Sequence, residues 1–178
     1  MARFVAFLRS INVGGHTVKM DELRRLFEGL GFTGVETFIA SGNVIFESKA
    51  GKSKALEKKL EGKLEAALGY RVATFVRAVG EVAEIAKYQP FQKPPEGSGL
   101  YIGFMAEPPG KEAGEKLQSF QSKTDEFHIH GREVYWLCHT RFSDSTFSGP
   151  LLEKVLGVAA TIRNSTTVQK IAVKYCLK

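Results

Sequence analysis

The stretch FVAFLRSINVGGHTVKM, residues 4–20, decides the fold that we expect for this chain. Residues 4–8 are apolar at every position, which predicts a central strand that is covered on both faces. Gly14 and Gly15 then predict a loop. A helix follows, because apolar residues recur at spacings of three and four: Met20, Leu23, Phe27 and Leu30. Gly31 ends this helix, so the stretch predicts a strand, a glycine loop and an amphipathic helix.

The first half of the chain continues in a regular order. Two short strands, 35–40 and 43–48, flank a Ser41-Gly42 turn and predict a hairpin. Leucines at spacings of four predict a second helix that ends at Gly69, and residues 72–77 predict a fourth strand. The predicted order is therefore strand, helix, strand, strand, helix, strand.

The second half repeats this order after a short helix at about 81–87 and a Pro/Gly-rich segment. The expected elements are a strand, a helix, a hairpin, a helix, a strand and a final helix: 100–105, 113–120, 127–130 with 133–139, 151–156, 158–163 and 168–175. A split strand–helix–strand unit of this kind is the ferredoxin-like plait. We predict an α+β protein with two ferredoxin-like (alpha-beta plait) four-stranded antiparallel sheets and helices on one face of each.

The domain boundaries follow from the Pro/Gly-rich segment, which is the clearest break in the chain. We expect a first ferredoxin-like subdomain with a linking helix over residues 1–88 and a linker over 89–99. The second subdomain, with an extra C-terminal helix, is expected over 100–178.

Composition sets limits on location and partners. Hydrophobic residues make up 43% of the 178 residues, and no apolar run approaches the ~18 residues of a membrane span. We expect no membrane partner. With only two cysteines a disulfide framework is excluded, which favours a reducing, cytoplasmic location.

Positive charge is concentrated in the first half. Residues 1–78 hold 13 Lys and Arg against 8 Asp and Glu, within a net charge of +6 for the whole chain. Such an excess attracts polyanions, including nucleic acid. Six of the lysines, however, lie between Lys49 and Lys63 beside three glutamates, and this pattern is typical of a solvated helix face.

The second face of the first sheet is expected to be apolar. Side-chain alternation places on it the following residues: Val5, Phe7, Phe38, Ile45 and Phe75, bordered by Arg9 and Arg77. One interpretation is that this face packs against the second half or, in a homodimer, against a second copy of the chain. The other is an aromatic platform for nucleic-acid bases, although the RNA-recognition motif that would support it is absent.

The topology predicts a candidate ligand site at one edge of the first sheet. In a plait, the end of the first strand, the tip of the hairpin and the start of the fourth strand lie at the same edge. The residues expected there are Arg9, Asn12, Gly14, Gly15, Ser41, Gly42, Asn43 and Arg71. Arginines, glycine-loop amides and the amides at the start of a helix together suit a phosphate or carboxylate group.

Other interpretations of this edge stay open. The glycines are neither a Walker A nor a dinucleotide-binding pattern, and they could simply turn the chain while Asn12 and Asn43 satisfy loop backbone groups. Our leading hypothesis is a protein that binds an anionic ligand, either a small molecule or nucleic acid. The alternatives are a small enzyme acting on a phosphorylated or carboxylate metabolite, or a protein-interaction module. No catalytic residue and no cofactor is predicted.

Two further groups of residues were weighed. His128 and His130 are two residues apart on a predicted strand, so both rings point to one face and lie about 7 Å from each other. Hairpin pairing places Tyr135 opposite His128 and Glu133 opposite His130. We interpret them as a polar surface pair and predict no metal site, although these residues could just supply three ligands. Arg163 and Asn164 read as a strand end and a helix cap, with a secondary anion site as the alternative.

Four motifs stand out in the chain: Leu8-Arg9-Ser10-Ile11-Asn12-Val13-Gly14-Gly15, Met20 with Leu23, Ser41-Gly42-Asn43-Val44, and Arg163-Asn164 followed by Thr167-Val168. Together they resemble the bacterial family called domain of unknown function 1697. The resemblance spans almost the whole chain. Ser10 and Ser165 stand where the family commonly shows a glycine and a tryptophan. The resemblance implies a doubled ferredoxin-like fold and no particular activity.

Overall fold

The computed structural model describes residues 1–9, 17–49 and 51–177, which divide into two compact units. The first unit comprises Met1–Ile85 and Ile171–Lys178, and the second comprises Ala86–Lys170. Each unit contains one four-stranded sheet in which every pairing is antiparallel. Within the described residues, no helix is long and apolar enough to cross a membrane.

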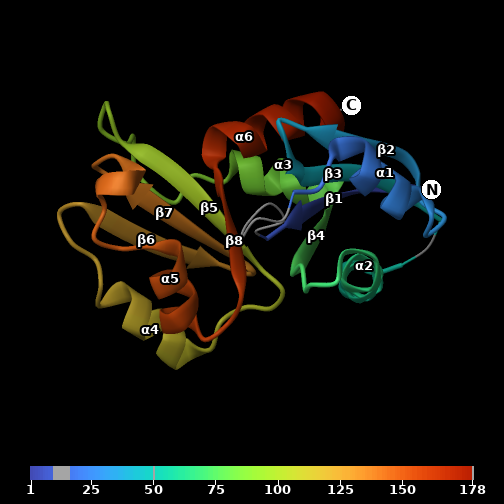
Figure 1. Cartoon of the computed structure of the whole chain (residues 1–178). Coiled ribbons are helices and arrows are strands. Elements are labelled where there is room, and N and C mark those ends of the chain that lie inside the picture. The colour runs from blue at the N-terminus through green and yellow to red at the C-terminus, as the bar shows by residue number, and fades with distance from the viewer. Residues whose placement is uncertain (10–16, 50, 178) are drawn as a thin grey trace. The chain divides into compact units, whose positions relative to one another are not determined.

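The first unit has the predicted element order (Figure 1). Its elements are β1 (Ala2–Leu8), α1 (Met20–Glu28), β2 (Thr33–Phe38), β3 (Ala40–Ser48), α2 (Ser53–Leu68), β4 (Thr74–Ala78) and α3 (Val79–Lys87), whose last residues pass into the second unit. The strand order is β2-β3-β1-β4, with β1 hydrogen-bonded to both β3 and β4. This is the strand order of the ferredoxin-like plait.

Side-chain alternation explains how this sheet holds its helices. Phe4, Ala6 and Leu8 of β1 lie in one buried cluster with Phe46 of β3. Three α2 leucines and two α1 residues belong to the same cluster: Leu56, Leu60, Leu64, Leu23 and Phe27. Burial of this shared apolar face fixes both helices on one side of the sheet.

The opposite face of the first sheet is also covered. Val5, Phe7, Ile45 and Phe75 are each no more than 2% exposed. Part of the cover comes from the C-terminal segment of the chain, because the rings of Tyr175 and Phe38 meet edge to face with centroids 5.7 Å apart. The rings of Phe7 and Phe75 are therefore not open to the stacking of bases.

The hairpin of the first unit turns at a different place from the predicted one. Asn43 pairs with Phe7, so the Ser41-Gly42-Asn43 segment is drawn into β3 and does not form the turn. The strands instead reverse at Ile39, which has a positive φ of 66° between the paired residues Phe38 and Ala40. A β-branched residue rarely adopts this conformation, so sequence preferences point away from the true turn.

The second unit repeats the architecture. Its elements are β5 (Gly99–Met105), α4 (Lys111–Gln118), β6 (Asp125–His130), β7 (Glu133–Cys138), a short 3₁₀ turn (Phe142–Asp144), α5 (Gly149–Leu156), β8 (Ala160–Asn164) and α6 (Ser165–Ile171). A π-helical turn, Ala172–Cys176, continues from α6 and belongs to the first unit. The strand order is β6-β7-β5-β8, and α4 and α5 lie side by side against this sheet (Figure 1).

An aromatic core holds the second unit together. The rings of Phe127, Trp136 and Phe147 are in mutual contact, and Leu152 and Val155 of α5 close the cluster. The predicted fold class is confirmed: the chain is an α+β protein with two four-stranded antiparallel sheets.

Candidate functional site

The strand register brings three segments of the predicted site to one edge of the first sheet. Arg9 follows β1, and its backbone N–H donates to the carbonyl oxygen of Ala73 at 2.9 Å, just before β4. On the other side of β1, Phe7 pairs with Asn43 of β3. The end of β1, the first part of β3 and the segment that contains Arg71 therefore meet at this edge.

The described residues at this edge differ in what they can offer a ligand. Asn43 is buried, and its side-chain amide nitrogen donates to the Phe38 carbonyl oxygen at 3.2 Å. This hydrogen bond joins β3 to the end of β2 and stabilises the hairpin. Gly42, within β3, and Arg9, directly after β1, are both half-buried. Arg71 is exposed. The two guanidinium groups and the nearby backbone amides are thus the groups suited to an anion.

The structure says little about the remaining predicted residues of this site. Asn12, Gly14 and Gly15, together with Ser10, lie outside the described residues. Ser41 lies in β3. The loop part of the predicted site therefore stays a prediction.

Carboxylates surround the same edge and limit what it attracts. Asp21 and Glu22 occupy the first turn of α1 and complement the positive end of that helix. Burial, and secondarily the charge of Glu22, raises the pKa of Tyr70 in the segment before β4. A carboxylate oxygen of Glu61 accepts the Thr74 N–H at 3.0 Å. Attraction for an anion therefore comes from the arginines rather than from the start of α1.

The secondary predicted site lies in the second unit, at the end of β8. The Arg163 guanidinium donates to Thr161 Oγ1 at 2.7 Å and to the Ile162 carbonyl oxygen at 3.0 Å, so it is held against its own strand. Burial lowers its pKa to about 10, which leaves the group charged at neutral pH. Asn164 Oδ1 accepts the Thr166 N–H at 2.8 Å, as expected of a residue that caps a helix.

A cavity of about 540 Å³ opens beside Asn164. Its described lining comes entirely from the second unit: Ala86 of α3, the segment that precedes β5, three residues of β5, Asn164 at the end of β8 and three residues of α6. Sequence reasoning does not predict this cavity, because residues 89–99 are expected only to form a linker. The signal available was the presence of Tyr88 and Phe91 in a segment that would otherwise be expected to be polar.

The predicted hairpin register of the histidines is confirmed, since His128 pairs with Tyr135 and His130 with Glu133. Their actual neighbour, Tyr88, was not anticipated. Its hydroxyl lies 2.9 Å from His128 Nε2, and its ring stacks on that of His130 with centroids 4.0 Å apart. Burial, helped by Glu133 and Tyr88, raises the pKa of Tyr135. Within the described part of the chain, no group of three His, Cys, Asp or Glu side chains is placed to hold a metal ion.

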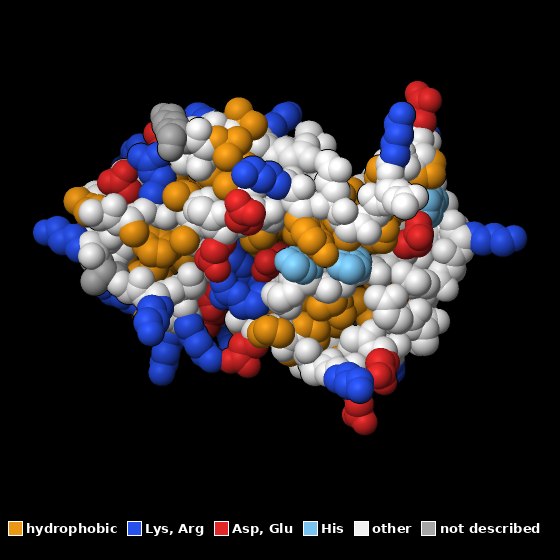
Figure 2. All heavy atoms as spheres, turned by 180° about the vertical axis from the view of Figure 1, so that it is seen from behind, with side chains coloured by type: hydrophobic (Ala, Val, Ile, Leu, Met, Phe, Trp, Pro, Cys, Tyr) orange, Lys and Arg blue, Asp and Glu red, His pale blue; other side chains and the backbone are white. Residues whose placement is uncertain are grey.

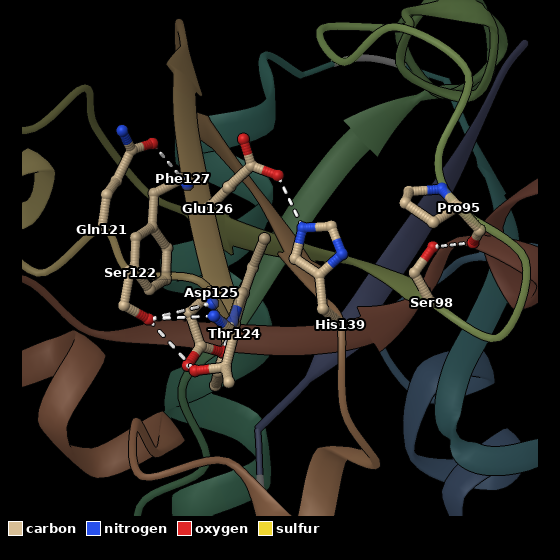
Figure 3. A network of polar contacts seen from close by, with 10 residues as sticks. Pro95, Ser98, Gln121, Ser122, Thr124, Asp125, Glu126, Phe127 and His139 are labelled. Carbon is tan, nitrogen blue, oxygen red and sulfur yellow. Dashed lines mark hydrogen bonds and ion pairs between the residues drawn. The ribbon is translucent and has the colours of Figure 1, made fainter.

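A polar network at the other end of this hairpin serves the fold (Figure 3). The buried carboxylate of Asp125 accepts from Trp136 Nε1 at 2.8 Å and from the hydroxyl of Ser145. His139 lies 2.7 Å from a carboxylate oxygen of Glu126, on the neighbouring strand. These contacts satisfy polar groups in and beside the aromatic core, which is a structural role.

Comparison with known proteins adds a family and a fold. A solved structure described as "conserved bacterial protein SP0830 from Streptococcus pneumoniae" is similar over 97% of this chain and 97% of that chain, with 22% identity and a TM-score of 0.70. At this identity the similarity shows the fold alone. A search of curated proteins finds no match. The model of the family described as "Protein of unknown function (DUF1697)" matches residues 1–135. The resemblance drawn from the motifs is thereby confirmed, and the chain belongs to the DUF1697 family.

Proposed function

We propose that this protein binds a small anionic ligand, through a phosphate or carboxylate group, at the edge where β1 ends. The observation that carries the proposal is the convergence of Arg9, the first part of β3 and the Arg71 segment at that edge. Two guanidinium groups beside backbone amides match the oxygen geometry of phosphate and carboxylate. The sequence predicts a glycine-containing loop after Arg9, and backbone amides from such a loop would add further donors.

A small ligand is favoured over nucleic acid. On the face shown in Figure 2, Lys and Arg side chains are interspersed with Asp and Glu and do not form a continuous basic surface. A nucleic-acid groove needs an extended row of positive charge, usually with exposed aromatic rings. The burial of the apolar face of the first sheet also counts against an interaction module or a homodimer that would use this face.

The cytoplasmic location is part of the same proposal. Both cysteines are free, with Cys138 buried and Cys176 half-buried. Free thiols are compatible with a reducing compartment. Among the described side chains of this edge, none is a nucleophile paired with a base, so binding is favoured over catalysis.

Thermal unfolding in the presence of inorganic phosphate tests the proposal. At a phosphate concentration about ten times Kd, the melting temperature should rise by roughly 3–6 °C over a chloride control of equal ionic strength. Arg9→Ala should abolish this rise, and Arg9→Lys should retain part of it. Arg132→Ala, which removes an arginine from the hairpin of the second unit, is the matched control and should keep the full rise.

The outcomes separate the alternatives. A rise that persists in Arg9→Ala, or no rise with phosphate or with small carboxylates, would contradict the proposal. A third outcome is that only a random oligonucleotide stabilises the protein, and that this effect is lost between roughly 50 and 200 mM salt. Such salt dependence is expected for several phosphate contacts and would show that the ligand is nucleic acid and not a small anion.

A further inference from the structure

The cavity of the second unit has the size and the chemistry of a ligand site separate from the β1 edge. Its volume of about 540 Å³ lies within the roughly 300–1,000 Å³ of pockets that take small organic ligands. All of its described lining residues belong to one unit. The described walls of the cavity are therefore formed by the second unit alone.

The two sides of the cavity differ in character. The segment before β5 contributes rings, namely Tyr88, Pro90, Phe91 and Pro94, and β5 adds Leu100 and Ile102. The β8–α6 junction contributes short polar side chains: Asn164, Ser165, Thr166 and Gln169. An apolar wall that faces converging polar groups is a usual arrangement in a specific small-molecule site.

Charge narrows the class of ligand. Lys93 is the one charged side chain among the described lining residues, and none of those residues is acidic. Asn164 uses its carboxamide oxygen for the Thr166 N–H, so the group that it presents to a ligand is its NH₂ donor. An ammonium group and an amide donor favour a partner with one negative, oxygen-bearing group.

The walls of the cavity are held in place before any ligand arrives. Tyr88 is fixed by its hydroxyl contact with His128 and by its stacking on His130. The loop between Pro94 and Gly99 is closed by the Ser98 hydroxyl and backbone N–H, which both donate to the Pro95 carbonyl oxygen (Figure 3). Preformed walls reduce the ordering cost of binding.

We propose that this cavity binds an aromatic carboxylate, with the flat ring between the aromatic and proline side chains and the carboxylate at Lys93 and Asn164. Ring stacking on Phe91 and Tyr88 supplies the attraction for the body of the ligand. The Lys93 ammonium and the Asn164 amide select for the acid over neutral analogues of the same shape.

A titration with 2-naphthoate, followed by amide chemical shifts in the full chain, tests the proposal, and 2-naphthamide is the uncharged analogue. Naphthoate should shift resonances of residues 88–94 and 164–166 and should bind more tightly than naphthamide. Lys93→Gln should weaken naphthoate binding about tenfold and leave naphthamide binding unchanged. Phe91→Ala should weaken both compounds.

Lys111→Gln, on the exposed first turn of α4, is the matched control for the lost charge and should bind naphthoate as the unmodified protein does. Lys93 is exposed, so its substitution should leave the melting temperature unchanged. The proposal is overturned if naphthoate leaves these resonances unshifted at millimolar concentration. It is equally overturned if Lys93→Gln weakens the acid and the amide alike, or if neither variant changes the affinity.

Discussion

The two units build the same plait but join its first strand and first helix differently. Eleven residues separate Leu8 from Met20 in the first unit, whereas five separate Met105 from Lys111 in the second. The short connection, which contains Pro108-Pro109-Gly110, shows that the fold itself needs few residues here. The additional length, glycines and flanking arginine in the first unit are thus not demanded by the fold. Loops longer than a fold requires are where binding residues concentrate.

The strands themselves are closely matched between the units. Ala6 of β1 pairs with Val44 and Val76, and Gly103 of β5 pairs with Val134 and Ile162. The scaffold is therefore duplicated while the edges have diverged. Substitutions in the scaffold should therefore change stability, whereas substitutions at the edge should change binding.

The largest effect is expected in the scaffold of the first unit. Phe46 is fully buried, and its ring lies within 5.7 Å, centroid to centroid, of three other phenylalanine rings: Phe4, Phe27 and Phe32. Phe46→Ala should lower the free energy of unfolding by about 3–5 kcal/mol, because it leaves a cavity among these rings. Urea unfolding followed by circular dichroism measures the loss. Phe120→Ala, at a ring that is 38% exposed, is the control and should cost much less.

A smaller effect should follow from making the second unit resemble the first. A Cβ at position 103 would lie 2.6 Å from the Val134 side chain, which is buried. Gly103→Ala should therefore destabilise the protein by about 1–3 kcal/mol, even though alanine occupies the matching position in β1. The fluorescence of Trp136, the only tryptophan, reports unfolding of this unit directly. An unchanged midpoint would mean that the strands of the two units are more alike than their side-chain packing indicates.

At the edge itself the effect should fall on binding and spare stability. Arg71 is exposed, so Arg71→Ala should weaken phosphate binding roughly 2- to 5-fold and leave the free energy of unfolding within about 0.5 kcal/mol. Titration calorimetry measures the affinity. If Arg71→Ala binds phosphate as tightly as the unmodified protein does, Arg71 does not belong to the site, and Arg9 is the remaining cation among its described residues.

The smallest effect concerns the cysteines, one in each unit. Burial raises the pKa of the Cys176 thiol from 9.0 to about 11, against an opposing effect of Arg3. The folded state therefore favours the neutral thiol. Its stabilising contribution is present below pH 9 and is lost as the pH rises from about 9 through 11. Urea unfolding at pH 7.5 and 10 should show a smaller loss in Cys176→Ala than in the unmodified protein, with Cys138→Ala as the comparison.

Much of the fold could be predicted because its signals are local and periodic. The apolar run of β1, the leucine spacing of α2 and the end of α2 at Gly69 each correspond to the observed structure. The first helix ends earlier than predicted, at Glu28 with Gly29 as its C-cap, and not at Gly31. The pairing of His128 with Tyr135 followed from counting residues across a two-residue turn. The hairpin turn at Ile39 could not be predicted, because pairing along β1 overrides the local preference for a turn at Ser41-Gly42.

The candidate sites were less accessible to sequence reasoning. The β1 edge was predicted because the plait fixes which strand ends are adjacent. The cavity beside Asn164 depends on contacts between distant segments, such as those that hold Tyr88 against His130, and no local pattern encodes them. The C-terminal helix was expected to belong to the second subdomain, yet Ile171–Lys178 groups with the first unit, where Tyr175 packs on Phe38.

The central claim is that the first unit carries an anion site at an edge that the second unit lacks. A phosphate titration of the ¹⁵N-labelled chain, read from amide chemical shifts, tests it most directly. We predict shifts at Arg9, Gly42 and the residues around Arg71, with no shifts at the matching edge around Met105 and Arg132. Equal shifts at both edges, or none at the first, would contradict the account.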